Sequence, residues 1–269
     1  MTRGDTPSPR PPRPAATVAL LRDSPAGVET LLLERPVEAE FAASALVFPG
    51  GGVDPEDSDQ RWSAITGLGP GGNPVDEVEP EAGSPDGRAF LVAAVREAFE
   101  ETAILLGAGA GSHQQDGWGL QQRNRLLAGE VGFADLLQEH DLRLDLGEVV
   151  YFARWITPEA LPVRFDARFY AAAATSGQVA VAAPGEIARL EWLTPAEALR
   201  RSESGQAYTL PPTQAALRSI GEHTTVAEVL SGLRRQRDLA AILPRVVGGG
   251  PGVDGDLRVL MPGDPGYDS

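Results

Sequence analysis

The chain has 269 residues, a net charge of −15 and 42% hydrophobic residues, but no cysteine. The hydrophobic content supports a packed core, and the length allows one large domain or two small ones. The negative charge argues against general nucleic-acid binding and against docking on an anionic membrane, because both need clustered positive charge. With neither cysteine nor lysine, the chain offers no thiolate metal site, cysteine nucleophile, Schiff base or phosphate-loop lysine. A small anionic substrate is allowed if a metal ion and a few arginines reverse the field locally.

Residues 1–14 are rich in proline and arginine and are expected to form a disordered tail. A polyproline ligand is the less favoured interpretation of this stretch. It has no apolar run after its charges, so we expect no secretory signal. No window of the sequence is apolar enough to span a bilayer. We therefore expect a cytoplasmic protein.

The first half of the chain predicts three strands and an insertion. Residues 15–23 and 28–35 are apolar runs on either side of a Ser-Pro-Ala-Gly turn, which is typical of paired strands. A shorter apolar run, Ala45–Phe48, ends at Pro49 and three glycines. Residues 55–87 are polar and rich in Gly, Pro, Asp and Glu, apart from an apolar island at 62–68. This composition indicates a long surface insertion.

The second half begins with a predicted helix over about 88–106, capped by Asp86 and stopped by Gly107. We expect strands at 148–157, 164–174 and 187–193, and helices over 119–139, from Pro195, and at 212–222 and 225–237. Residues 244–269 form a Gly- and Pro-rich C-terminal tail with one candidate strand at 257–261. This order predicts a mixed α/β domain over 15–243.

Three glutamates share one face of the predicted helix. Glu97, Glu100 and Glu101 stand at positions i, i+3 and i+4, and like charges at this spacing repel each other. A bound cation explains such a cluster, and oxygen ligands suit Mg²⁺ or Mn²⁺. A solvated acidic face is the usual interpretation of a Glu-rich helix taken alone. The three histidines lie far apart, and no G-x-S-x-G serine motif occurs.

The glycine run Gly50–Gly52 permits close backbone approach. It is no dinucleotide loop, since the G-x-G-x-x-G spacing fails and no helix begins there. Combined with Arg96-Glu97 and Glu100-Glu101, the run resembles the Nudix box, with its central R-E-x-x-E-E and its upstream glycine, here Gly51. Phe48-Pro49-Gly50 is similar to the usual lead-in to that box.

The chain departs from the box at three points. Asp57 replaces its first glutamate, Ala103 replaces its last glycine, and far more residues separate Asp57 from Arg96 than the box has there. An insertion at this place resembles the Nudix branch that includes peroxisomal coenzyme A diphosphatases. That resemblance implies an α/β/α sandwich around a mixed β-sheet, with an extra helical C-terminal part.

The resemblance also implies the roles of individual residues. Glu97, Glu100 and Glu101 would hold Mg²⁺ or Mn²⁺, and Arg96 would pair with a neighbouring glutamate and fix its rotamer. The general base would be one of these glutamates or a carboxylate from a later loop, for which Glu186 is the candidate. The Gly50–Gly52 turn, made of Gly50, Gly51 and Gly52, would bring its backbone close to the metals and substrate.

Arg164 and Arg168 alternate with apolar residues, so they share one face of a predicted strand with Asp166. Such an arginine pair could bind phosphate bidentately. It could equally form a surface ladder of charges with Asp166 that contributes little.

The implied activity is metal-dependent hydrolysis of a nucleoside diphosphate linked to another moiety, with coenzyme A or acyl-CoA favoured. The partner is then a small anionic diphosphate substrate, with no nucleic acid and no membrane, and a homodimer is allowed. ADP-ribose or NADH-type substrates stay open. So do a Nudix-fold nucleotide-binding module without catalysis and a structural α/β protein with an acidic helix.

Overall fold

The computed structural model describes residues 11–38, 42–67, 85–108, 117–174, 177–236, 238–248 and 258–267. Within these residues, one eight-stranded mixed sheet has the order β10-β3-β2-β1-β8-β7, with β4 added beside β1 and β9 beside β2. Its strands are β1 (Arg13–Ser24), β2 (Gly27–Glu34), β3 (Ala45–Val47), β4 (Gly50–Gly52), β7 (Val150–Ile156), β8 (Phe165–Ala173), β9 (Arg189–Leu193) and β10 (Tyr208–Thr209). The pairs β1–β8 and β3–β10 are parallel, and the other pairs are antiparallel.

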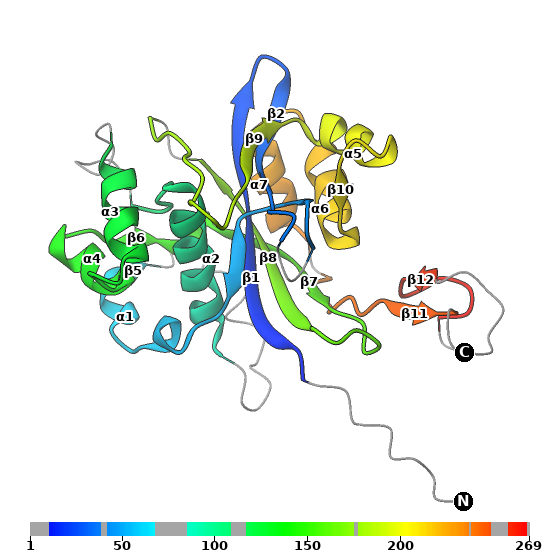
Figure 1. Cartoon of the computed structure of the whole chain (residues 1–269), viewed down its shortest axis with the longest axis horizontal. Helices are drawn as coiled ribbons and strands as arrows, with labels where there is room; N and C mark the ends of the chain where they lie inside the picture. Colours follow the sequence, from blue (N-terminus) through cyan, green and yellow to red (C-terminus); the bar gives the residue numbers. More distant parts are fainter. Residues whose placement is uncertain are drawn as a thin grey trace, which may run out of the picture.

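Helices cover both faces of this sheet (Figure 1). One face carries α1 (Trp62–Ile65), α2 (Gly87–Thr102), α3 (Trp118–Leu127) and α4 (Phe133–Glu139). The other carries α5 (Pro195–Glu203), α6 (Pro211–Gly221) and α7 (Val226–Arg234). The predicted α/β/α sandwich around a mixed sheet, with further helices towards the C-terminus, is confirmed.

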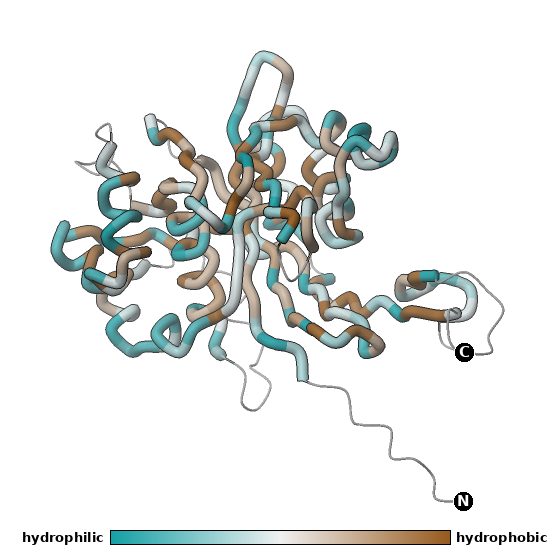
Figure 2. Tube along the Cα trace, in the orientation of Figure 1, coloured by the Kyte–Doolittle hydropathy of each residue, from teal (hydrophilic) through white to brown (hydrophobic). Residues whose placement is uncertain are grey.

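Two hydrophobic cores lie on the two faces of the sheet, because neighbouring strand residues point in opposite directions. Val18 and Leu20 of β1 pack in the core under α2. Ala19 and Leu21 pack in the core under α6 and α7. A strand buried on both faces needs a continuous apolar run, and the sequence provides one at this position. Figure 2 shows hydrophilic residues on the outer helices α4 and α5 instead.

The first strand begins earlier than predicted. Residues 1–10 of the expected tail lie outside the described residues, but Arg13 and Pro14 belong to β1. The Arg13 N–H donates to the Arg164 carbonyl at 2.9 Å, and the Val53 N–H donates to the Pro14 carbonyl at 3.0 Å. The prediction that the tail extends to residue 14 is therefore wrong, because backbone pairing on both sides fixes its last two residues.

Two different strands pair with the same edge of β1. The end of β1 pairs with β2, as in Leu21 with Thr30, whereas its beginning pairs with β4, as in Ala16 with Gly51. The Pro49 carbonyl accepts from the Val18 N–H at 2.8 Å, where the chain crosses from β3 to β4. This pairing brings the glycine run into the sheet next to α2.

The segment predicted as a surface insertion is partly buried. It contains a short 3₁₀ helix, Pro55–Ser58, and α1, and residues 68–84 lie outside the described residues. Trp62 is buried and its ring centroid lies 5.8 Å from that of Phe133 in α4. The apolar island in the polar stretch therefore anchors the start of the insertion in the helical layer.

Helix α2 begins as predicted, with the Asp86 carboxylate accepting from the Ala89 N–H at 2.8 Å. It ends at Thr102 rather than near residue 106, because Ala103 adopts a left-handed φ of 60°. The next residues, Ile104 to Leu106, are buried and lie outside any helix or strand. The predicted stop at Gly107 is therefore wrong. The expected helical region over 119–139 is also two helices, since α3 and α4 are separated by Gly129, whose φ is 69°.

Short elements complete the described structure. β5 (Thr66–Gly67) pairs with β6 (Leu144–Asp145), and a 3₁₀ turn follows at Leu146–Glu148. Near the C-terminus, β11 (Arg245–Val247) pairs with β12 (Arg258–Leu260). Among the described residues, no helix has the length and apolarity needed to cross a bilayer.

Candidate active site

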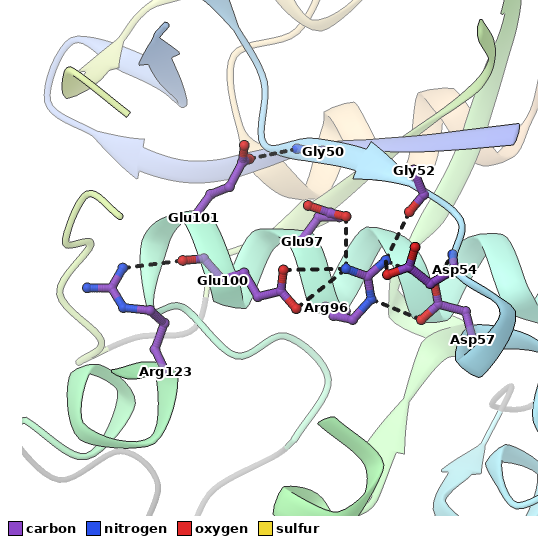
Figure 3. A network of polar contacts seen from close by, with 9 residues as sticks. All are labelled: Gly50, Gly52, Asp54, Asp57, Arg96, Glu97, Glu100, Glu101 and Arg123. Atoms are coloured by element: carbon purple, nitrogen blue, oxygen red, sulfur yellow. Dashed lines mark hydrogen bonds and ion pairs between the residues drawn. The ribbon is translucent and has the colours of Figure 1, made fainter. Parts of the chain in front are cut away.

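Gly50–Gly52 form the strand β4 and not the expected turn. This strand packs directly on the glutamates of α2, and this close backbone approach is what the sequence predicted (Figure 3). The Gly50 N–H donates to Glu101 Oε2 at 2.9 Å. A Cβ on Gly51 would lie 2.4 Å from the Glu97 carboxyl carbon. Glu101 is buried, whereas a solvated acidic face would leave it exposed. Only a residue without a side chain allows β4 to approach the helix this closely.

Because β4 packs so closely on its neighbours, we expect substitutions of its first two glycines to have different effects. In Gly51→Ala the new methyl group would displace only the end of the Glu97 side chain, so we expect a large loss of activity and a small change in melting temperature. In Gly50→Ala the methyl group would meet backbone, 2.4 Å from the Ala16 carbonyl oxygen and 2.7 Å from Thr17 Cα. That variant should be destabilised by about 1–3 kcal/mol. Hydrolysis assays and thermal melts of both variants test this. Equal destabilisation would contradict it.

Arg96 lies at the centre of the polar network in Figure 3. Its Nε and Nη2 donate to the two carboxylate oxygens of buried Asp57 at 3.0 and 2.9 Å. Nη1 also donates to Glu97 Oε1 at 2.8 Å, and Nη2 to the Gly52 carbonyl at 2.9 Å. Burial alone would lower the pKa of Arg96, but the hydrogen bond with Asp57 and the nearby carboxylates raise it overall.

The predicted partner of Arg96 was a neighbouring glutamate, which is correct but incomplete. Its bidentate partner is Asp57, the residue that stands in place of the first glutamate of the box. A bidentate pair fixes the guanidinium plane, so Arg96 can hold Glu97 in one orientation. The insertion therefore leaves this part of the site intact, because its first turn, which contains Asp57, packs on α2.

Burial makes the glutamates weaker acids. It raises the pKa of Glu97 to about 7, with a further increase from Glu100, against the opposing effect of Arg96. Burial also raises the pKa of Glu101 to about 8, although the Gly50 N–H acts in the opposite direction. The pKa of Glu100 is raised for the same first reason. Near neutral pH Glu97 and Glu101 are therefore partly protonated, and a cation can take the place of the protons.

These shifts predict a pH dependence of stability. The ordinary glutamate pKa is 4.5, so between about pH 4.5 and 8 the folded protein binds more protons than the unfolded chain. The free energy of unfolding of the metal-free protein should therefore fall as pH rises through this window, by several kcal/mol at roughly 1.4 kcal/mol per pKa unit. Mg²⁺ should restore more stability at high pH than at low pH. Melting curves with chelator and with Mg²⁺ check this, and a metal-free stability that rises across the window would contradict it.

Glu186 is brought to the rim of the same site. The segment before it lies on the C-terminal end of α2, with the Val181 N–H donating to the Thr102 carbonyl at 2.8 Å and the Ala183 N–H to the Glu101 carbonyl at 3.1 Å. Glu186 is exposed, and its charge contributes to the raised pKa of Glu100 and of Glu101. It therefore lies within electrostatic reach of both glutamates.

Two arginines of this region were not predicted as site residues from the sequence. Arg123 of α3 is buried, and its Nη1 donates to the carbonyls of Glu100 at 3.3 Å and Val181 at 3.1 Å, which joins α2 to the Glu186 segment. Arg35, just after β2, lowers the pKa of Glu101 through its charge. Neither lies in the box-like motif, and their contacts with α2 join segments that are far apart in the sequence.

Arg164, just before β8, and Arg168 of β8 are buried rather than exposed, so the surface-ladder interpretation is wrong. Arg164 Nε donates to the Thr157 carbonyl at 3.1 Å. The Arg168 guanidinium lies 3.7 Å from the centre of the Phe90 ring, about two helical turns before Glu97. Asp166 forms a bidentate pair with Arg154 at 2.8 and 2.6 Å. None of these contacts involves the glutamates, so phosphate binding by Arg164 and Arg168 stays a prediction.

The candidate ligands are all carboxylate oxygens, which is the type of ligand that a hard divalent cation binds. They do not form a closed cage. No three acidic, histidine or cysteine side chains within the described ranges converge as a ready metal site. Arg96 and the Gly50 N–H hold the carboxylate oxygens instead. An open arrangement suits Mg²⁺, which usually takes one or two carboxylates and completes its shell with water and substrate phosphate.

Comparison with known proteins identifies the family. A family model described as the NUDT19 Nudix domain matches residues 7–220. The chain belongs to the NUDT19 Nudix domain family. Nudix hydrolases generally use divalent metal ions, which agrees with the carboxylate cluster on α2.

Individual relatives of this Nudix chain are similar at low identity. The acyl-coenzyme A diphosphatase NUDT19 of Gallus gallus is 29% identical, over 70% of this chain and 60% of the relative. The protein of that name from Homo sapiens is 25% identical, over 95% of this chain and 76% of the relative. The chain thus spans less than two thirds of the chicken relative. A crystal structure of a NUDIX hydrolase from Alicyclobacillus acidocaldarius is 27% identical with a TM-score of 0.69, covering 84% of this chain and 99% of that one.

Proposed function

We propose that this chain is a metal-dependent Nudix diphosphatase. It hydrolyses the diphosphate bond of a nucleoside diphosphate linked to another moiety, and coenzyme A or acyl-CoA is the favoured substrate. The observation that carries the proposal is the face of α2 with Glu97, Glu100 and Glu101, which the glycine strand β4 covers and Arg96 helps to orient. The names of the chicken and human relatives support the choice of substrate.

The acidic residues of the site would have two roles, binding of the metal ion and proton transfer. Glu97, Glu100 and Glu101 would hold Mg²⁺ or Mn²⁺, which neutralises charge on the diphosphate oxygens. The base that accepts a proton from the attacking water is one of these glutamates or Glu186. A pKa near neutrality, as at Glu97, suits this task. Water adds to one phosphorus, the bridging P–O bond breaks, and two phosphate monoesters leave.

The supporting residues keep these carboxylates in place. Arg96 fixes Glu97 through the 2.8 Å hydrogen bond, and is itself fixed by Asp57. The Gly50 N–H fixes Glu101. Positioning of this kind accounts for much of phosphoryl-transfer catalysis, because the reaction needs little covalent chemistry from the protein.

The test is a panel of diphosphates incubated with Mg²⁺ or Mn²⁺, namely coenzyme A, acyl-CoA, ADP-ribose and NADH. We expect coenzyme A or its acyl derivatives to give phosphate monoesters fastest. Faster turnover of ADP-ribose or NADH would assign the alternative Nudix substrates. Tight nucleotide binding without turnover in saturating metal would assign a non-catalytic binding module. The cytoplasmic location and the homodimer stay predictions, which fractionation and sedimentation can test.

A further inference from the structure

An apolar pocket of about 440 Å³ lies on the face of the sheet opposite α2. Its floor is formed by alternate residues of β1 and β8, such as Thr17, Ala167 and Phe169, which therefore point to the same side. The volume lies within the usual range of small-molecule sites, roughly 300–1,000 Å³. The opposite wall comes from later parts of the chain, including Leu210 before α6 and Val246 of β11.

The pocket adjoins the acidic site. Gly50 and Gly51 line it, while on their other side the Gly50 N–H binds Glu101 and Gly51 touches Glu97. A wall of two glycines therefore separates the apolar space from the glutamates. A substrate bound at the glutamates has this pocket next to its diphosphate.

Most of the pocket lining is uncharged. Among the lining residues that the structure describes, Arg35 is the only charged one. Its Nε is buried and has no hydrogen-bond partner within the described residues, and its charge acts on Glu101. A cationic group therefore marks the end next to the catalytic glutamates. Away from it, the lining consists mostly of aliphatic and aromatic side chains.

We propose that this pocket holds the aliphatic arm of the substrate, with the adjoining phosphate against Arg35 and the acyl chain along the apolar floor. The proposal rests on the proposed function and makes the acyl arm a determinant of specificity. The phosphate of such an arm is anionic and would match Arg35, and the acyl chain is apolar and would match the uncharged lining. A nucleotide that carries a further phosphate group would need more than one cationic side chain, and Arg35 is the single charged residue among the described lining residues.

The direct test measures binding without hydrolysis. S-acyl phosphopantetheines carry the arm and one phosphate but no diphosphate, so the enzyme has no bond to cleave. Titration calorimetry with the acetyl, butyryl, hexanoyl and octanoyl compounds should show affinity rising with chain length. Full burial of a methylene corresponds to about a fourfold gain per group. Equal affinity along the series would overturn the proposal.

Variants of lining residues test whether the dependence of affinity on acyl-chain length comes from this pocket. Ala167→Leu fills the floor and should lower the octanoyl affinity roughly tenfold while changing the acetyl affinity less. Leu161→Asn removes an apolar group from the lining at a residue that is 42% exposed, so folding is preserved. Leu127→Asn on α3 is the matched control, since Leu127 is also 42% exposed and does not line the pocket. Thermal melts establish that each variant is folded.

The outcomes separate this inference from the proposed function. A chain-length dependence that is weakened by Leu161→Asn but not by Leu127→Asn supports the pocket, even if no diphosphate is hydrolysed. Hydrolysis of acyl-CoA with no chain-length effect overturns the pocket and leaves the reaction standing. Loss of adenosine 3′,5′-diphosphate binding in Ala167→Leu, with acyl-arm binding intact, would assign the pocket to the base and overturn the proposal.

Discussion

Glu100→Gln and Glu101→Gln should each reduce diphosphate hydrolysis by roughly a hundredfold or more, the usual effect of removing a catalytic carboxylate. Each substitution keeps the size of the side chain and removes the charge that would hold the cation. Product formation at saturating Mg²⁺ or Mn²⁺ measures the effect. Full activity in both variants would contradict the assignment of these glutamates as metal ligands.

Stability separates a catalytic effect from a folding defect. Burial opposes the charge of Glu101 and raises its pKa to about 8. Glu101→Gln should therefore keep or increase the stability of the metal-free protein at alkaline pH. Glu139→Gln is a matched control on α4, where the glutamate is exposed and paired with Arg125. This control should change neither activity nor stability appreciably.

Asp57→Ala should lower the free energy of unfolding by about 3 kcal/mol. It removes the bidentate partner of Arg96, whose side chain is only 9% exposed, and leaves a buried guanidinium with fewer acceptors. Activity should fall as well, because Arg96 would no longer hold Glu97 in place. Chemical denaturation of the metal-free protein at neutral pH measures the stability.

A surface ion pair provides the control for Asp57→Ala. Asp135 pairs with Arg61 at 2.6 Å, but the two side chains are 53% and 34% exposed. Asp135→Ala should therefore cost about 1 kcal/mol or less. If the two substitutions cost the same, the Asp57–Arg96 pair would not contribute to stability as its burial implies.

Predictions from local spacing succeeded because helix and strand geometry repeats over a few residues. The spacing of Glu97, Glu100 and Glu101 was enough to predict a common helical face. The apolar runs at 15–23 and 28–35 were likewise enough to predict two paired strands. The end of α2 was missed because Ala103 adopts a conformation that alanine disfavours, so the packing of the following buried residues outweighed its local preference.

The sequence by itself determined the acidic face, the close approach of the glycine run to it, and the order of the longer strands and helices. Only the tertiary structure decided that Asp57 is the bidentate partner of Arg96, that Arg123 ties the Glu186 segment to α2, and that later segments close the pocket beside Gly50. These contacts join residues that lie far apart in the chain. Their formation depends on how the whole sheet and its helices pack, and the local propensities of the residues contain no information about that packing.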